Sequence, residues 1–460
     1  MTATTSGLPQ TSVAETLAEK IAALQPGALP AATLRKCEDL LIDVVGLCAT
    51  ARNEDYVASA LAGCDDGGPC TAIGHRRTLS TAGAAFVNGT AAHGEDFDDT
   101  FEGGPVHAGA VIVPAVIAAC ERHNPDGRMA LTGIAVGTEV LCRLSLVVPK
   151  AVHMAGFHPT AIFGAVGAAA GVGAALGLNS KQIVDALGVA GSMAGGIIEY
   201  LAEGAWTKRL HAGWAAQSGI RAALLARGGF VGPRTVFEGV HGLFHGFAHT
   251  TKGDYDALTG DFGTRWVTDT LAFKPYPCGT MAQPYIDCAR RLAARGIKPE
   301  DVTEIVCEVA EGTVHRLWEP LADKQRPRNG YAAKFAVPYL LAAGFVHGGV
   351  GLGAFTESAV RDARVLALAA KVKFVIDPDN PYPGNYTGHI RATLRDGSVE
   401  EERQPYLRGG AQEPLTRQDV IDKFRLNAEH GGWSAAQGDA TLQLLAGLYN
   451  DRIDLSSLRN

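Results

Sequence analysis

The sequence predicts an α+β protein that combines a large all-helical domain with a smaller α/β domain. Through the first two-thirds of the chain, apolar residues recur every three or four positions, as on the buried face of a helix. After about Thr264, apolar and polar residues alternate instead, which is typical of half-buried strands. From Thr416 the helical period returns. We therefore expect a discontinuous helical domain over residues 1–265 and 411–460, and an α/β domain over residues 266–410.

The helical region divides at proline, glycine and capping residues. Apolar periodicity predicts helices over about 17–24, 34–48, 80–93, 108–123, 129–147, 158–177 and 210–228. Pro159 occupies the favoured first position of its helix, and Asn179-Ser180 caps the next one. The stretch from Thr160 to Leu178 is uncharged over about the length of a membrane span, but it is mostly Ala and Gly. We interpret it as a buried helix of a soluble protein, in which Gly167-x-x-x-Gly171 allows two helices to pack closely.

The region after Thr264 predicts strands with helices between them. Alternation indicates strands over 303–310 and 372–376, and Asp396-Gly397 joins 389–394 to 399–403 as a hairpin. Helices are expected at 283–295 and 335–343, and Thr416-x-x-Asp419 caps a C-terminal helix. The glycines from Gly348 to Gly353 follow a helical segment rather than a strand. They therefore indicate the end of a helix and not a phosphate-binding loop.

Composition excludes several classes of protein. Hydrophobic residues make up 47% of the 460 residues and charged residues 19%, so the chain can bury large cores and is not disordered. The net charge of −7 argues against a nucleic-acid partner. The nine cysteines include no C-x-x-C pair, which argues against a disulfide framework, a zinc ribbon and a cysteine-held iron–sulfur cluster. With no signal peptide at Met1–Pro9, we expect a cytoplasmic protein with reduced thiols that binds no membrane.

The densest polar cluster runs from His93 to Thr100 and continues to Glu102 and His107. Four carboxylates (Glu95, Asp96, Asp98 and Asp99) fall within five residues and repel one another. The cluster is either a solvated helix end or a site loop between two apolar helices. A magnesium–diphosphate site would need a second acidic cluster, and the sequence has none that is convincing.

Isolated histidines and basic residues provide further candidates. His241, His245 and His249 recur every four residues, but their glycine-rich surroundings favour a structural role over a metal site. His158 precedes Pro159 at the electropositive end of a helix, which suits an anion. Its structural alternative is a capping histidine. Lys274 lies where the sequence pattern changes, and its structural alternative is a solvated surface residue.

Several motifs in order along the chain resemble the MmgE/PrpD family. They are Asn88-Gly89, His93, Asp96-Phe97-Asp98-Asp99-Thr100, His107, Gly156-Phe157-His158-Pro159-Thr160, Thr207-Lys208-Arg209-Leu210-His211-Ala212-Gly213, Phe273-Lys274-Pro275-Tyr276-Pro277-Cys278 and Ala333-Lys334-Phe335-Ala336-Val337-Pro338-Tyr339. The resemblance covers nearly the whole chain. It implies a helical domain with an α/β lid domain, a homodimer, and no metal or organic cofactor.

The resemblance also implies the site residues. By motif, the decarboxylase site falls on Asp96, Thr100, His107, His158, Lys208, Lys274 and Tyr339. This chain departs from the family pattern directly after His107. Decarboxylases and methylcitrate dehydratases have proline there, and this chain has Ala108. The stretch before His107 also differs, and it adds the carboxylate of Glu102.

The residue types suit reactions at a carbon next to a carboxylate. Such reactions need cations to neutralise the carboxylate and an acid/base to move a proton. Lys208, Arg209 and Lys274 are candidate cations, and His107 and His158 are candidate proton carriers near pH 7. The remaining candidates have supporting roles: Asp96 orients a histidine or keeps a lysine charged, Thr100 and Tyr339 donate hydrogen bonds, and Lys334 binds substrate.

We therefore expect a cofactor-independent lyase or isomerase that acts on a small di- or tricarboxylic acid. The first choice is a hydro-lyase like 2-methylcitrate dehydratase. A cis-aconitate decarboxylase-like or iminodisuccinate epimerase-like activity is the alternative. A magnesium-dependent helical enzyme and a non-catalytic carboxylate-binding protein remain as rival hypotheses.

Overall fold

The computed structural model describes residues 11–25, 27–104, 106–450 and 452–459. The chain divides into two compact units. Unit 1 consists of Met1–Gly94, Asp98–Leu271 and Arg417–Asn460, and unit 2 of Glu95–Phe97 and Ala272–Thr416. No sequence pattern indicated that Glu95–Phe97 would group with the second unit.

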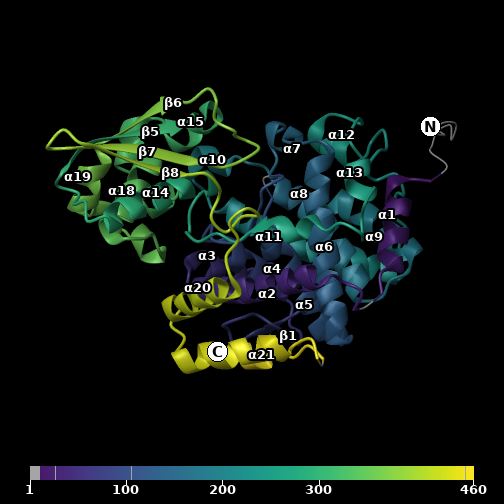
Figure 1. The fold of residues 1–460 in the computed structure, drawn as a ribbon. Coiled ribbons are helices and arrows are strands. Elements are labelled where there is room, and N and C mark those ends of the chain that lie inside the picture. Colours follow the sequence, from purple (N-terminus) through teal and green to yellow (C-terminus); the bar gives the residue numbers. More distant parts are fainter. Residues whose placement is uncertain (1–10, 26, 105, 451, 460) are drawn as a thin grey trace. The chain divides into compact units, whose positions relative to one another are not determined.

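Unit 1 is built almost entirely from helices (Figure 1). Its α-helices in the described residues are α1 (Val13–Ala23), α2 (Ala31–Ala51), α3 (Asp55–Ala62), α4 (Thr81–His93), α5 (Gly109–His123), α6 (Gly127–Val147), α7 (Ala151–Met154), α8 (Pro159–Ala175), α9 (Ser180–Met193), α10 (Tyr200–Glu203), α11 (Thr207–Arg227), α12 (Leu243–Ala248), α13 (Asp256–Thr259), α20 (Arg417–His430) and α21 (Ala435–Gly447). Two short 3-10 helices, η1 (Val267–Thr270) and η5 (Ser456–Leu458), and the strands β1 (Cys70–Thr71), β2 (Thr78–Leu79) and β3 (Thr100–Phe101) complete it; β4 (Leu271–Ala272) spans the boundary. The strong periodic helices were predicted, whereas the four-residue helices are too short to show a period.

Unit 2 is a mixed α/β structure. Its helices in the described residues are α14 (Gln283–Ala294), α15 (Glu311–Leu317), α16 (Leu321–Gln325), α17 (Gly330–Ala333), α18 (Val337–His347) and α19 (Ala363–Ala369), with 3-10 helices η2 (Thr280–Ala282), η3 (Leu352–Phe355) and η4 (Ala359–Arg361). Its described strands β5 (Val302–Val309), β6 (Val372–Ile376), β7 (Gly388–Leu394) and β8 (Val399–Gln404) form a sheet in the order β6-β5-β7-β8. β6 is parallel to β5, and the other pairs are antiparallel.

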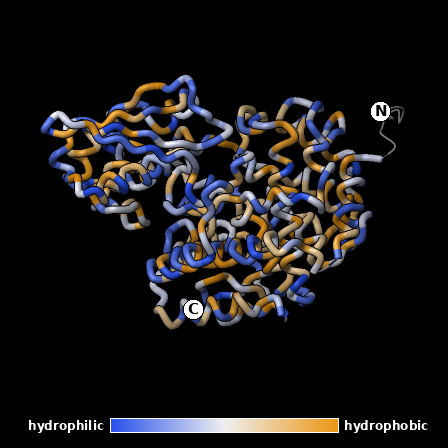
Figure 2. The backbone as a smooth tube through the Cα atoms, viewed as in Figure 1, coloured by the Kyte–Doolittle hydropathy of each residue, from blue (hydrophilic) through white to orange (hydrophobic). Residues whose placement is uncertain are grey.

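The core of unit 1 depends on small residues. α6 and α8 cross so closely that a Cβ added at Gly171 would lie 2.6 Å from the carbonyl oxygen of Gly133. The predicted close packing at Gly167-x-x-x-Gly171 is therefore confirmed. Hydrophobic residues, orange in Figure 2, occur along the helices of unit 1, and almost every residue of α8 is buried. By length and composition α6 is the one described helix apolar enough to cross a membrane, but its apolar window is almost wholly buried in this core.

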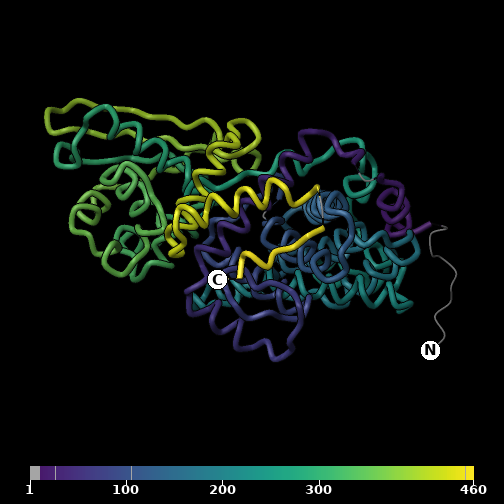
Figure 3. The backbone as a smooth tube through the Cα atoms, turned by 90° about the horizontal axis from the view of Figure 1, so that it is seen from below, coloured from purple at the N-terminus to yellow at the C-terminus, as the bar shows by residue number. Residues whose placement is uncertain are grey.

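Helix α20, the first helix after unit 2, returns to the N-terminal part of unit 1 and packs along α2 (Figure 3). The Lys423 ammonium lies 2.8 Å from Asp43 Oδ1, and both side chains are buried. Thr50 donates its hydroxyl to the carbonyl oxygen of Asn427 at 2.8 Å. The last segment of the chain thus completes the environment of α2.

In unit 2, α14 packs against β7 and β8, and α18 packs against α14 (Figure 1). The helix predicted over 335–343 begins two residues later, at Val337, because Pro338 takes a first-turn position. It continues to His347. Gly348 then adopts φ +71°, the left-handed conformation that ends the helix. The glycine run therefore terminates a helix, as predicted.

Candidate active site

The loop between α4 and α5 folds inward. Its carboxylates Asp96, Asp98 and Asp99 are buried, and Glu95 is half-buried. A Cβ at Gly94 would overlap the hydroxyl of Tyr56, so a larger residue where the chain leaves α4 would displace that ring. The alternative of a solvated helix end is therefore wrong, and the loop carries its charged groups into the interior.

Asp99 caps α5 with both carboxylate oxygens. Oδ2 accepts the backbone N–H of Ala108 at 3.0 Å, and Oδ1 accepts that of Gly109 at 2.8 Å. Burial, together with the neighbouring charges of Asp98 and Asp43, raises the pKa of Asp99 to about 7. Because this carboxylate faces backbone donors, it does not serve as a magnesium ligand in this arrangement. Among the described residues, no three His, Cys, Asp or Glu side chains gather as metal ligands would.

The departure from the family pattern at position 108 has a structural consequence. Ala108 supplies one of the two N–H groups that hold Asp99. A proline in its place would have no N–H to donate. The Asp99 cap is therefore more completely hydrogen-bonded in this chain than a proline would allow.

His107 is held in one tautomer. Its Nδ1 lies 2.7 Å from the backbone carbonyl oxygen of Asp99, 3.3 Å from the Thr100 hydroxyl and 3.8 Å from Asp98 Oδ2. A carbonyl oxygen can only accept, so Nδ1 carries the hydrogen and the neutral ring keeps its lone pair on Nε2. The side chain is 12% exposed. Thr160, in the first turn of α8, accepts the backbone N–H of His107 at 3.2 Å and fixes the loop to that helix.

Four imidazoles of unit 1, from His93, His107, His158 and His211, form what we term the histidine cluster. Adjacent ring centroids are 5.1 Å apart for His93 and His107, 5.7 Å for His93 and His158, and 5.2 Å for His158 and His211. Asp98 Oδ2 accepts from His93 Nδ1 at 2.6 Å. The sequence allowed Asp96 to orient a histidine, but the carboxylate on a histidine is that of Asp98.

His158 and His211 are a neutral pair. Their Nδ1 atoms are 3.1 Å apart, so one ring donates and the other accepts. Burial, followed by the charges of His93, His211 and Lys208, lowers the pKa of His158 well below its usual value. Burial and the charges of His93 and Lys208 lower the pKa of His211 to about 4. At pH 7 His158 is thus a neutral hydrogen-bonding group, and its expected role as a proton carrier stays a prediction.

The two adjacent basic residues at the start of α11 point to different places. Lys208 is buried, and its charge acts on His158 and His211. Arg209 stacks on Tyr56, with Cζ 4.3 Å from the ring centroid. Arg209 also lines a cavity of about 560 Å³ together with the half-exposed Trp206 and Trp214. The structure therefore brings Lys208 together with the histidine cluster and places Arg209 outside it.

The candidate residues of unit 2 hold the segment Glu95–Phe97. Lys274 donates to the carbonyl oxygen of Asp96 at 3.0 Å and lies 3.6 Å from its Oδ1. Asp96 has φ +55°, a left-handed conformation that Asp tolerates better than most residues. Lys334 donates to Glu95 Oε2 at 2.7 Å and to the Glu95 carbonyl oxygen at 2.6 Å. Both lysines are buried.

The hydroxyl of Tyr339 is also hydrogen-bonded within the protein. Its hydroxyl donates to the carbonyl oxygen of Ala354 at 2.6 Å. Burial raises the pKa of Tyr339 to about 12, so the phenol stays protonated near neutral pH. The expected role of Tyr339 as a hydrogen-bond donor to substrate would require this bond to open.

Sequence reasoning did not select His93, Asp98 or His211 as site residues. One signal was present for His211, which follows Lys208 by three positions and so shares its helix face. His93 and Asp98 stood in the polar cluster, but only the turn of the loop brings them into contact.

Comparison with known proteins decides the family. The model of the MmgE/PrpD N-terminal domain matches residues 15–256, and that of the MmgE/PrpD C-terminal domain matches residues 276–445. The chain belongs to the MmgE/PrpD family. The histidine cluster lies within the N-terminal match, and Lys334 and Tyr339 lie within the C-terminal match.

Named relatives of this MmgE/PrpD enzyme are lyases. Human cis-aconitate decarboxylase is 29% identical over 435 residues, which cover 91% of this chain and 88% of the human protein. The mouse cis-aconitate decarboxylase is 31% identical over 362 residues, covering 75% and 71%. A mitochondrial 2-methylcitrate dehydratase of Yarrowia lipolytica is 27% identical over 175 residues, covering 33% and 32%. The expected family and the expected enzyme class are thereby confirmed.

Proposed function

We propose that this protein is a carboxy-lyase that removes one carboxylate from a small unsaturated di- or tricarboxylic acid, with cis-aconitate as the first compound to test. The observation that carries the proposal is the fixed tautomer of His107. Its Nδ1–H is bound to the Asp99 carbonyl oxygen, so protons are exchanged at Nε2. The cis-aconitate decarboxylases match most of this chain, and they support this choice over the dehydration that the sequence alone placed first.

The proposed reaction uses side chains of the chain itself. The bond between carbon and the departing carboxylate breaks, CO₂ leaves, and the electron pair remains on the carbon skeleton. Conjugation with a neighbouring carboxylate spreads this charge, and the ammonium of Lys208 neutralises it. Nε2 of the His107 imidazolium then donates its proton to carbon, and the ring recovers a proton from solvent.

Asp98 and His158 would support these groups. The Asp98 carboxylate, 3.8 Å from His107 Nδ1, attracts the imidazolium form. His158 is neutral and buried, so it can hydrogen-bond to a substrate carboxylate without competing for the proton. Lys274, Lys334 and Tyr339 remain predicted site residues that mutation must test.

The test is a panel of carboxylic acids incubated with the enzyme in D₂O and followed by proton NMR. We expect cis-aconitate to lose one carbon as CO₂ and to give a five-carbon dicarboxylate with deuterium at the protonated carbon. Activity should survive EDTA. Loss of water without loss of CO₂ from 2-methylcitrate would instead support the second candidate, dehydration, which the shorter Yarrowia lipolytica match favours. Solvent exchange at a stereocentre without a new product would indicate epimerisation.

We also propose that two copies of the chain associate. The exposed face of α11 carries Leu210, Trp214 and Leu225 at helical spacing, and Trp214 and Leu225 are nearly half exposed. Aromatic and aliphatic residues gathered on one helix face mark an interaction surface. Light scattering during gel filtration should give twice the mass of 48.1 kDa, and Trp214→Glu should shift the protein toward the monomer.

A further inference from the structure

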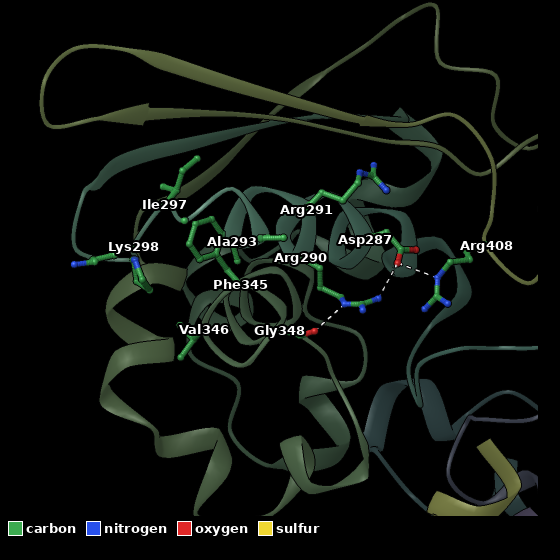
Figure 4. Close-up of a pocket in the computed structure, with 13 residues that line it drawn as sticks. Asp287, Arg290, Arg291, Ala293, Ile297, Lys298, Phe345, Val346, Gly348 and Arg408 are labelled. Carbon is green, nitrogen blue, oxygen red and sulfur yellow. Dashed lines mark hydrogen bonds and ion pairs between the residues drawn. The ribbon is translucent and has the colours of Figure 1, made fainter. Parts of the chain in front are cut away.

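Unit 2 contains a cavity of about 760 Å³ that none of the predicted site residues lines. Its walls are the second half of α14, the turn over 296–299, the end of α18 and Arg408 (Figure 4). A cavity of this size holds a small organic molecule.

Two arginines and one carboxylate form the polar end of this cavity. Asp287 is buried and accepts the Tyr276 hydroxyl at 2.5 Å and Arg408 Nε at 3.1 Å. Arg290 Nη1 lies 3.6 Å from the same Asp287 oxygen and 2.8 Å from the Tyr276 hydroxyl. Arg290 Nε donates to the carbonyl oxygen of Gly348 at 2.7 Å, which holds the guanidinium across the cavity (Figure 4).

This end has one positive charge in excess. Asp287 is the one carboxylate that lines the cavity, and it is shared by Arg290 and Arg408. Each guanidinium has five N–H donors. The interactions above leave at least two donors on each, and the two side chains are 40% and 28% exposed. Arg291 does not add to this end, since it turns toward the sheet and binds Glu402 and Gln404.

The rest of the cavity is mainly apolar, with Lys298 and Arg291 as the other charged residues in its lining. Ala293, Ile297, Phe345 and Val346 line it, and Figure 4 shows them beyond Arg290 on the side away from Asp287. A ligand that satisfies both ends has an anionic group for the arginines and a hydrocarbon body for the apolar wall. A bare inorganic anion would leave that wall wet, and a neutral apolar molecule would leave the excess charge uncompensated.

We propose that this cavity is a binding site for a small amphipathic carboxylate, which is held by Arg290 and Arg408 at its charged end and by Ala293 and Phe345 along its body. The site is separate from the histidine cluster, which belongs to unit 1. It is connected to a predicted site residue along the chain, because Tyr276 lies two positions after Lys274.

The experiment measures binding of phenylacetate to the full chain by isothermal titration calorimetry, with phenylacetamide and inorganic phosphate as comparison probes. We expect phenylacetate to bind, and both comparison probes to bind at least tenfold more weakly. Arg290→Gln and Arg408→Gln should each weaken phenylacetate binding at least tenfold. Arg361→Gln, which makes the same charge change at a side chain of unit 2 that is 72% exposed, should not.

Two further variants separate this site from other carboxylate sites and from misfolding. Ala293→Phe fills the apolar wall without changing charge and should abolish binding while the circular dichroism spectrum is unchanged. His107→Ala should leave phenylacetate binding intact. The proposal is overturned if phenylacetate does not bind, if the amide or phosphate binds equally well, or if His107→Ala rather than Ala293→Phe removes binding. These readouts do not depend on turnover, so they hold whether or not the carboxy-lyase proposal succeeds.

Discussion

His107 donates its Nδ1 hydrogen to the backbone carbonyl oxygen of Asp99, while the carboxylate of Asp99 caps the helix that begins two residues after His107. One residue thereby sets both the tautomer of the candidate proton carrier and the start of α5. A helix end is rigid, so His107 is presented on a fixed support rather than on a mobile loop.

The first prediction concerns His107 itself. His107→Ala should lower kcat on cis-aconitate, the proposed substrate, by about 10²–10⁴-fold, the usual contribution of general acid–base catalysis. The fold should persist, because the ring is at the edge of the interior and Asp99 keeps its capping bonds. Steady-state kinetics with circular dichroism measures both, and the exposed His241→Ala is the matched control. A kcat within threefold of the wild-type value would remove His107 from the mechanism.

The second prediction concerns the departure at position 108. Ala108→Pro removes the N–H that Asp99 Oδ2 accepts, so a buried carboxylate oxygen loses its partner. We expect the free energy of unfolding to fall by about 1–3 kcal/mol in urea denaturation. Ala108→Gly keeps the N–H and is the control. Equal stability of the proline and glycine variants would show that this hydrogen bond contributes little.

The third prediction uses Lys208 as an electrostatic probe. Its charge contributes to the low pKa values of His158 and His211. Lys208→Met should therefore raise both imidazole pKa values. If Lys208 neutralises the substrate as proposed, this variant should also reduce turnover by orders of magnitude. NMR titration of the imidazole protons measures the first effect. Lys181→Met, at a lysine side chain that is 77% exposed, should leave the titrations unchanged; identical titration curves in both variants would contradict the assignment.

The fourth prediction is the pH dependence of stability. His211 has a folded-state pKa of about 4 against an ordinary value of 6.5, so between these values the unfolded chain binds more protons. Its contribution to stability is present above pH 6.5 and is lost as the pH falls toward 4. His211→Asn should remove this loss. Between pH 7 and pH 4 we therefore expect the free energy of unfolding of the wild type to fall by roughly 3 kcal/mol more than that of the variant.

Asp99 changes stability in the opposite direction over the same pH range, and its effect must be separated from that of His211. Its pKa is raised from 3.8 to about 7, so the folded state binds more protons in this window and Asp99 favours stability at the lower pH. This contribution is common to the wild type and His211→Asn, and it cancels in their difference. Chemical denaturation at pH 4, 5, 6 and 7 gives the two curves. Parallel curves would mean that His211 is not buried as a neutral ring.

Part of the site could be read from the sequence. The motif around Asp96–Thr100 identified the loop, and the His158-Pro159 pair located a helix start, because capping and proline preferences are local. Lys208 and His211 share a face of α11 for the same reason. The neutrality of His158 could not be read in this way, since it results from burial against His211, which is 53 positions further along the chain.

What the sequence by itself determined is the order and type of the long elements, since apolar periodicity, caps and glycine stops act over a few residues. It also carried the family motifs. Only the tertiary structure decided that the loop carboxylates turn inward, that Asp98 rather than Asp96 meets a histidine, and that adjacent Lys208 and Arg209 serve different surroundings. The physical reason is that hydrogen-bond partners and desolvation come from segments far apart in the chain. The same residue types would be solvated on an open loop, and here they are buried, paired and shifted in pKa.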